Sequence, residues 1–263
     1  MLPARIRGYK REWLDELTLS GEVVWARLWG SGATPIRSTP VCLVPQGELE
    51  TWLNLSAAPA DGALGHAASE LHGELTRRGA LFAQGLSRAT RLHPDELDEG
   101  LSELVARGRL TCDSFGGLRS LLQSASKRRT TNGMAGRWSL LQREATGEPA
   151  TAAEFVAEKL LARTGVVFRK TLAREKQPLP WRDLLRVLRT LEARGLVRGG
   201  RFVAGFDGEQ YALPEAVTLL RAVRKRGPTE PVHAGAADPL NYRGILTPDA
   251  RISPLSRQKI LVA

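Results

Sequence analysis

The sequence has few cysteines, no long hydrophobic run and fewer acidic than basic residues. Its 263 residues include only Cys42 and Cys112, with no CxxC pair or Cys/His cluster, which excludes a disulfide framework and a structural zinc site. We expect two free, buried thiols in a reducing, cytoplasmic setting. No apolar run approaches the roughly 18 residues of a membrane span, and the N-terminus leads into a charged helix rather than a signal-peptide core. The sequence therefore predicts neither a metal site nor a membrane partner.

Motifs for nucleotide hydrolysis are missing as well. There is no P-loop pattern and no glycine is followed by lysine, so this chain cannot hold a nucleoside triphosphate as P-loop proteins do. The four histidines are scattered, as expected of surface or capping residues rather than of ligands or catalytic bases. Asp238 precedes Pro239 in a segment typical of a turn, and a carboxylate in a base-removing site is the alternative. Whether the chain is an enzyme stays open at this point.

A repeat organises the middle of the chain. Residues 78–82 match residues 164–168, and residues 106–110 match residues 193–197, with almost the same spacing. Each copy reads as an amphipathic helix, a short helix after a Gly-x-x-Phe turn, and a longer helix followed by strand-like residues. Three helices followed by a β-ribbon are typical of a winged helix, and two generic helical hairpins are the alternative.

Proline and glycine mark the ends of the longer helix in each copy. Pro94 and Pro180 lie where a first-turn proline is tolerated. Gly108 and Gly195 lie where a helix commonly ends with a left-handed residue. These positions set the predicted bounds of the two longest helices.

Composition divides the chain into five segments. The predicted fold class is α+β, with tandem winged-helix domains and a small β-barrel or sheet formed by the N- and C-terminal segments. Residues 13–25 look like a last helix, its glycine and a wing strand without the two preceding helices, so we expect the chain to be part of a longer polypeptide. The segments are residues 1–60 (partial winged-helix and β segment), 61–122 (acidic copy), 123–150 (basic linker with the apolar run Gly-Arg-Trp-Ser-Leu-Leu), 151–227 (basic copy) and 228–263 (C-terminal β segment).

The net charge of +10 favours a polyanionic partner, but the two copies differ in charge. Residues 60–118 carry 6 basic and 9 acidic residues, whereas residues 151–227 carry 16 and 8. The third helix of the first copy holds five carboxylates, which phosphates would repel, so we exclude it from a DNA groove. In the second copy the corresponding helix places arginines at i, i+4 and i+7 on one face, and further arginines continue into the wing. The predicted contacts are Arg182, Arg186, Arg189, Arg198 and Arg201.

Other basic and aromatic residues extend this predicted nucleic-acid surface. Lys127, Arg128 and Arg129 form a basic run in the linker. Trp25 ends a strand-like segment and is followed closely by Arg27, and an aromatic side chain beside a cation can stack on an unpaired base. Packing of Trp25 in the core is the alternative.

Several segments then match a known family. The most specific are Gly-Arg-Phe-Val-Ala-Gly-Phe at 200–206 and Ala-Leu-Pro-Glu-Ala-Val at 212–217. Together with weaker matches, which span essentially the whole chain, they resemble the region that follows the motor lobes in Lhr proteins, the large helicase-related superfamily 2 DNA helicases of bacteria. The weaker matches lie at 14–25, 116–119, 136–141, 165–169, 184–195 and 238–248.

The resemblance implies a function that the residues alone do not. Lhr proteins are ATP-driven 3′-to-5′ translocases that unwind duplexes and RNA:DNA hybrids, with roles in DNA repair. Their RecA-like motor lobes hold ATP and magnesium and are not in this chain, so we expect no cofactor here and motor lobes of the same polypeptide as a partner. The family also implies a base-stacking tryptophan, which matches Trp25 by position, with Trp13 as second choice. The chain is predicted to be a non-catalytic clamp on single-stranded DNA or an RNA:DNA hybrid.

Two other functions stay open. Tandem winged helices are similar to those of DNA glycosylases such as AlkZ, and larger Lhr proteins carry a C-terminal extension associated with uracil removal. In such a site Asp238 would orient water or stabilise the cationic sugar. The Gln-x-Gln signature of AlkZ-like enzymes is absent. Alternatively, the acidic first copy binds a basic partner surface or the motor lobes, as a protein-interaction or oligomerisation module.

Overall fold

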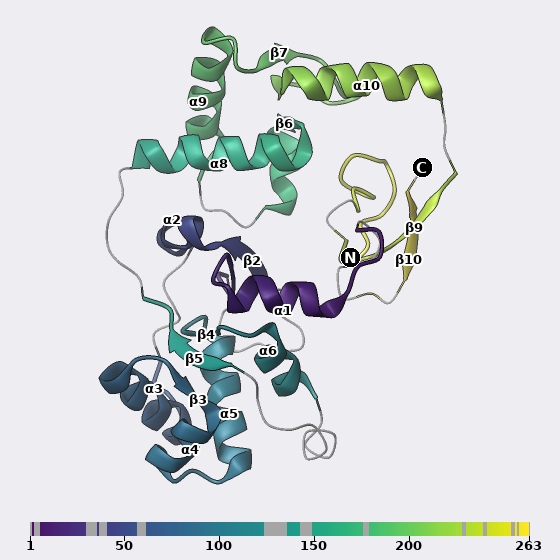
Figure 1. Cartoon of the computed structure of the whole chain (residues 1–263). Coiled ribbons are helices and arrows are strands. Elements are labelled where there is room, and N and C mark those ends of the chain that lie inside the picture. The colour runs from purple at the N-terminus through teal and green to yellow at the C-terminus, as the bar shows by residue number, and fades with distance from the viewer. Residues whose placement is uncertain are drawn as a thin grey trace. The chain divides into compact units, whose positions relative to one another are not determined.

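The computed structural model divides the chain into two compact units, one ending at Thr146 and the other beginning at Gly147. Each unit is described by itself (Figure 1). The structure describes residues 2, 6–29, 36, 41–56, 62–123, 136–142, 149–175, 179–227, 230–238, 241–253, 256 and 258–262.

The N-terminal unit contains one complete winged helix and a preceding strand pair. Helices α3, α4 and α5 pack against an antiparallel sheet of order β3-β5-β4, and β1 pairs separately with β2. We call α3 to α5 with this sheet the first winged helix. The elements are α1 (Arg11–Leu19), β1 (Val23–Ala26), β2 (Cys42–Pro45), the 3-10 helix η2 (Gln46–Glu48), α2 (Leu49–Leu55), α3 (His66–Arg78), β3 (Leu81–Phe82), α4 (Ala83–Thr90), α5 (Pro94–Ala106), β4 (Leu110–Cys112), α6 (Phe115–Leu122) and β5 (Arg137–Leu140).

The C-terminal unit repeats this topology. Its sheet has the order β6-β8-β7, so the last strand again lies between the first two, as in the N-terminal unit. We call α8, η3 and α9 with this sheet the second winged helix; α10 follows it (Figure 1). The elements are α8 (Pro149–Thr164), β6 (Val166–Phe168), the 3-10 helix η3 (Arg169–Arg174), α9 (Trp181–Ala193), β7 (Arg198–Gly200), β8 (Gln210–Ala212), α10 (Pro214–Arg226), β9 (Val232–Gly235) and β10 (Lys259–Val262).

Three of the four predicted helix ends are confirmed in the structure, whereas Pro180 is the extended N-cap residue before α9 and does not lie in its first turn. Pro94 is the first residue of α5, and the Glu96 side chain accepts a hydrogen bond of 2.8 Å from the His93 backbone N–H. Gly108 and Gly195 follow α5 and α9 with φ of 67° and 73°, the left-handed conformation that glycine adopts without a steric cost. The α+β fold class is confirmed too, with helices and antiparallel strands in both units.

Two tryptophans form the centre of the first winged helix. Trp25 and Trp138 are both fully buried, and their rings meet edge to face with centroids 6.2 Å apart. Leucines from α3 and α5 pack around them, and the Thr111 hydroxyl on β4 donates a 2.6 Å hydrogen bond to the Trp25 carbonyl. Residues of β1 thereby belong to the core of a domain that begins forty residues later in the chain.

The structure differs from the predicted linker and adds elements that were not predicted. Residues 137–140 lie in β5 at the centre of the first sheet, where Trp138 faces the core, and are not part of a linker. The apolar character of this run in a polar context was the signal for burial. The first strands of the two sheets, β3 and β6, and helix α6 were not predicted, because two- or three-residue strands carry too short a pattern.

The predicted barrel or joint sheet of the two ends is wrong for the described residues. β1 pairs with β2 in the N-terminal unit, and β9 pairs with β10 in the C-terminal unit. Residues 242–246, which lie in the segment predicted to be β, form a turn in which the Ile245 N–H donates to the Tyr242 carbonyl. No helix in the described part of the chain is long and apolar enough to cross a membrane.

Both cysteines are free thiols, as predicted. Cys112 is buried in β4, and this burial raises the pKa of its thiol to about 12, so it stays protonated at neutral pH. Cys42 on β2 is only half-buried, which corrects the expectation for that residue.

Candidate nucleic-acid interface

Helix α9 carries a leucine face and an arginine face. Leu184, Leu188 and Leu191 are buried in the second winged helix. Residues 182, 186 and 189 have the same spacing but start two positions earlier, about 200° around a helix of 3.6 residues per turn, so they lie on the opposite side. The side chains of Arg182 and Arg186 are 81% and 79% exposed. The predicted arginine face is therefore presented to solvent.

Local ion pairs engage these arginines unequally. The Asp183 carboxylate lies 3.7 Å from Arg182 and 3.4 Å from Arg186, and all three side chains are in contact with water. Exposed pairs of this geometry are weak and easily exchanged for a phosphate. Arg194 likewise lies 3.4 Å from Glu154 on α8. Arg182 and Arg186 thus remain available to an anion.

Arg189 is held more firmly by the wing. Its Nη2 and Nε donate to Glu209 at 2.7 and 3.2 Å, and the Tyr211 hydroxyl donates to the same carboxylate at 2.9 Å. The hydrogen bond from Arg189 lowers the pKa of Glu209, and its counterpart raises the pKa of Arg189. Burial, with the bond to Glu209, raises the pKa of Tyr211 to about 12. Of the predicted contacts on α9, Arg189 has the shortest ion pair, at 2.7 Å to Glu209 against 3.7 and 3.4 Å for Arg182 and Arg186 to Asp183.

The wing loop is shaped by Gln210, which is fully buried. Its side-chain oxygen accepts from the backbone N–H groups of Phe202 and Val203 at 2.9 and 2.8 Å, and its amide donates to the Val203 carbonyl at 2.9 Å. These bonds close the loop between β7 and β8, since one residue serves three backbone groups. Neither Glu209 nor Gln210 was predicted as part of this site. The sequence signal that could have indicated them is their position as two polar residues directly before Tyr211, a strand residue.

Arg198 and Arg201 lie in this wing and are exposed. Within the described ranges neither forms an ion pair, so both can contact a phosphate. We define the α9–wing surface as the side chains of Arg182, Arg186, Arg198 and Arg201. It combines a helix and a wing of one winged helix, the two elements through which such folds commonly meet nucleic acid.

The first winged helix presents the opposite charge at the equivalent helix. Asp95, Glu96 and Glu99 on α5 are exposed, and Glu103 pairs with Arg107 at 2.8 Å. A phosphate backbone would approach three exposed carboxylates there, although the Asp95 carboxylate lies 3.9 Å from His93 and Glu96 accepts from the His93 backbone N–H. The predicted exclusion of this helix from DNA agrees with these exposures.

The structure corrects the predicted role of Trp25. The side chain is 0% exposed and lies in the core against Trp138, so no face is free to stack on a base. Arg27 is only 1% exposed, and the three nitrogens of its guanidinium have no hydrogen-bond partner within the described ranges. Its burial lowers its pKa. The strand-like segment around Trp25 forms part of the core.

Trp13 and the linker residues give different outcomes. Trp13 on α1 is 38% exposed and stacks edge to face on Tyr9 at 6.2 Å, so part of its ring is accessible. Lys127, Arg128 and Arg129 lie outside the described residues. Of the two tryptophans that the resemblance indicated for base stacking, Trp13 therefore stays a candidate.

Asp238 lies in a tight turn after β9 and is 8% exposed. Its backbone N–H donates to the Gly235 carbonyl at 2.9 Å, and its carbonyl accepts from Asn241 at 2.9 Å. The Asn241 side chain donates to the Ala236 carbonyl and closes the turn from the other side. The geometry agrees with a turn residue.

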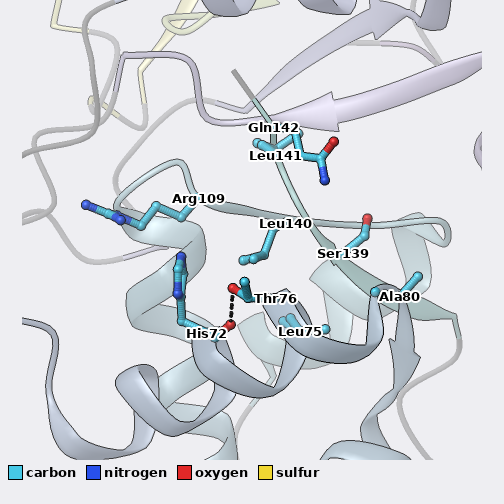
Figure 2. A pocket seen from close by; sticks show the side chains of 10 residues that line it. His72, Leu75, Thr76, Ala80, Arg109, Ser139, Leu140, Leu141 and Gln142 are labelled. Atoms are coloured by element: carbon cyan, nitrogen blue, oxygen red, sulfur yellow. Dashed lines mark hydrogen bonds between the residues drawn. The ribbon is translucent and has the colours of Figure 1, made fainter. Parts of the chain in front are cut away.

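A separate pocket of about 520 Å³ lies in the N-terminal unit between α3 and the ends of β4 and β5. Figure 2 shows Arg109 and His72 at one edge of it and Ser139 and Ala80 at the other, with Leu140 between them. The Thr76 hydroxyl in this pocket donates a 2.8 Å hydrogen bond to the His72 carbonyl. With one guanidinium among mainly neutral and apolar side chains, this pocket lacks the cluster of cations found on the α9–wing surface. In the part of the chain that the structure describes, no group of three metal-ligating side chains occurs.

Comparison with known proteins connects these features to a family. A family model described as the winged-helix domain of large helicase-related protein matches residues 146–232, which include the whole second winged helix. A second model with the same description matches residues 1–46, which include α1, β1 and β2. The two models represent the fourth and third such domains of Lhr.

Two curated proteins are similar over almost the whole chain. One is named Lhr helicase/uracil glycosylase, from Escherichia coli (strain K12), and is 31% identical over 100% of this chain and 19% of its own length. The other is named Lhr helicase/probable uracil glycosylase, from Mycolicibacterium smegmatis, and is 30% identical over 93% of this chain and 18% of its own length. The chain spans about a fifth of these relatives.

Proposed function

The chain belongs to the large helicase-related (Lhr) family, and on that premise we propose that it binds single-stranded nucleic acid through the α9–wing surface. The observation that carries the proposal is the solvent-facing arginine row of α9, opposite its buried leucines. Four guanidinium groups on one helix and its wing can neutralise consecutive phosphates of a strand.

The finer role we propose is a non-catalytic clamp within a longer helicase. The two relatives are named helicases and are about five times as long as this chain, which supports a place beside motor lobes in one polypeptide. The clamp would hold the tracking strand of DNA, or of an RNA:DNA hybrid, during 3′-to-5′ translocation in DNA repair. ATP and magnesium are assigned to the motor lobes, because this sequence has no P-loop pattern.

Salt dependence tests the electrostatic part of this proposal. Four phosphate contacts predict a slope of about −2.8 for the logarithm of the association constant against the logarithm of salt concentration. The charge reversal Arg182→Glu/Arg186→Glu should weaken oligothymidylate binding and reduce the slope to about −1.4, measured by fluorescence anisotropy between about 50 and about 300 mM salt.

A matched control separates position from net charge. Arg221→Glu/Arg224→Glu makes the same change in charge on the exposed part of α10, outside the α9–wing surface. It should leave the slope close to that of the unchanged chain. Equal loss from both double variants, or binding that does not respond to salt, would refute the proposal.

A second candidate function is favoured by the relatives' names, both of which include uracil glycosylase. In that case Asp238, a buried carboxylate, would assist removal of a base. Uracil-containing single-stranded DNA would acquire abasic sites with the unchanged chain but not with Asp238→Asn. Asp249→Asn, an exposed carboxylate 3.4 Å from Arg243 in the same segment, is the control. Abasic-site formation that survives Asp238→Asn would exclude this residue.

A further inference from the structure

A pocket of about 630 Å³ opens beside the α9–wing surface, within the C-terminal unit. Its lining comes from three elements: Arg169 and Lys170 begin η3, Trp181 begins α9, and Phe206 and Asp207 lie in the wing loop. Two leucines complete the wall. Its size lies within the range of small-ligand sites.

The wing loop reaches this pocket because it runs back along α9. Glu209 is bonded to Arg189 in the middle of α9, and Phe206 and Asp207, two and three residues before Glu209, share a pocket with Trp181 at the helix start. The pocket is therefore adjacent to Arg182, the first member of the arginine row.

The aromatic wall is fixed in place. The Phe206 ring packs on Phe168 with centroids 5.2 Å apart and planes tilted by 47°, and Phe168 is buried in the core of the second winged helix. Trp181 is partly buried and is the first residue of α9. Rigid aromatic side chains at the edge of a pocket form a platform for a flat ring with little further loss of entropy.

The polar groups of the pocket match the remaining parts of a nucleotide. Arg169 and Lys170 are exposed, and neither forms an ion pair with any residue that the structure describes, so both can take a phosphate. Asp207 is an exposed carboxylate and accepts hydrogen bonds only. An exposed carboxylate beside bound phosphates favours a base that presents a donor to it, and the exocyclic amino groups of cytosine, adenine and guanine are such donors.

We propose that this pocket receives one unstacked nucleobase of the bound strand, stacked against Trp181 and Phe206. The flanking phosphates bind Arg169 and Lys170, and Asp207 selects a base with an exocyclic amino group. This inference rests on the proposed strand-binding function, but it concerns a different set of residues and adds the stacking of one base to the affinity. Phosphate contacts of Arg169 and Lys170 would also make the salt slope steeper by about 1.4 than the four contacts of the α9–wing surface alone.

The test uses the whole chain and two oligomers of equal length and charge. One is an abasic oligodeoxynucleotide, and the other is identical except for a single central cytidine. Stacking of one base predicts about 5- to 150-fold tighter binding of the cytidine oligomer. A central thymidine should gain less than cytidine, and Asp207→Asn should reduce that difference.

Substitutions separate the pocket from the α9–wing surface. Trp181→Ala should remove most of the advantage of the cytidine oligomer while leaving the salt slope unchanged, and Trp181→Phe should retain it. Arg182→Glu/Arg186→Glu should do the reverse, lowering the slope but preserving the ratio. Circular dichroism checks the fold of Trp181→Ala, and where that variant unfolds, Phe206→Leu replaces it.

Three distinct results would overturn the inference. Salt-dependent binding with equal affinity for the abasic and the cytidine oligomers would refute the base pocket and leave the proposed function standing. Absence of salt-dependent binding to every oligomer would refute both. A cytidine advantage that survives both Trp181→Ala and Phe206→Leu would place the base elsewhere on the chain.

Discussion

Arg189 and Glu209 are joined by two hydrogen bonds of 2.7 and 3.2 Å, which connect helix α9 of the second winged helix to its wing. The bond fixes the wing against α9 and positions the loop that carries Phe206. It also withdraws one arginine from the row that faces solvent. The Arg189–Glu209 pair thus positions the wing loop, but it leaves Arg189 unavailable to a phosphate.

Removing the carboxylate should release this arginine. We expect Glu209→Gln to tighten binding to single-stranded DNA at low salt and to make the salt slope steeper by about 0.7, the contribution of one further phosphate contact. The slope from fluorescence anisotropy is the measurement. Glu215→Gln, an equal change in charge at an exposed position of α10, should produce a smaller effect. Equal effects of the two variants would show that net charge alone acts.

Tyr211 should titrate at unusually high pH. Burial and the hydrogen bond to Glu209 raise the pKa of its phenol from 10.0 to about 12. Because the folded pKa exceeds the unfolded one, the resulting stability is fully present below about pH 10 and is lost as the pH rises towards 12. The measurement is an ultraviolet absorbance titration of the unchanged chain and of Tyr211→Phe. Subtracting the second curve from the first isolates the Tyr211 phenol among the three tyrosines. A difference curve centred at pH 10 or below would contradict the prediction.

Two equivalent glycines should tolerate alanine differently. Gly108 and Gly195 both adopt a positive φ, which costs a residue with Cβ about 1–2 kcal/mol. At Gly108 the new Cβ would lie within van der Waals overlap of the Arg27 carbonyl oxygen, whereas at Gly195 no atom lies within 4 Å. Gly108→Ala should therefore lower the free energy of unfolding by more than Gly195→Ala, measured by urea denaturation. Equal losses would show that the backbone at Arg27 moves away without a loss of stability.

Trp25 should behave as a core residue. Trp25→Ala removes a fully buried ring from beside Trp138, and truncations of this kind cost about 3–5 kcal/mol of unfolding free energy. Trp25→Phe fills most of the space and should bind oligothymidylate with unchanged affinity. Urea denaturation and anisotropy measure the two effects. Weaker binding by a folded Trp25→Phe chain, with Trp138→Phe unaffected, would return Trp25 to the strand-binding surface.

Local patterns in the sequence were sufficient for some features. The helix ends at Pro94, Gly108 and Gly195 were predictable because proline and glycine act on the backbone of their own turn. The arginine face of α9 was predictable because helical periodicity alone places positions 182 and 186 together. These inferences need no knowledge of any distant contact.

Other features depend on residues far apart in the chain. Trp25 and Trp138 are separated by more than a hundred residues, and only the packed domain reveals that they cover each other. The strand character of residues 137–140 is likewise set by β3 and β4 on either side, since a four-residue strand has little preference of its own. Residue type alone does not show whether an aromatic side chain is buried or exposed, because such a side chain can pack in a core or stack on a ligand at the surface.

By itself, the sequence determined the repeat, the α+β class, the opposite charges of the two winged helices and the arginine row of α9, because each follows from spacing or composition. Only the tertiary structure decided which of these groups meet solvent. It buried Trp25 and Arg27, bonded Arg189 to Glu209, and brought Trp181 to Phe206 around one pocket. The physical reason is that exposure and ion pairing are properties of the folded surface, which long-range packing creates.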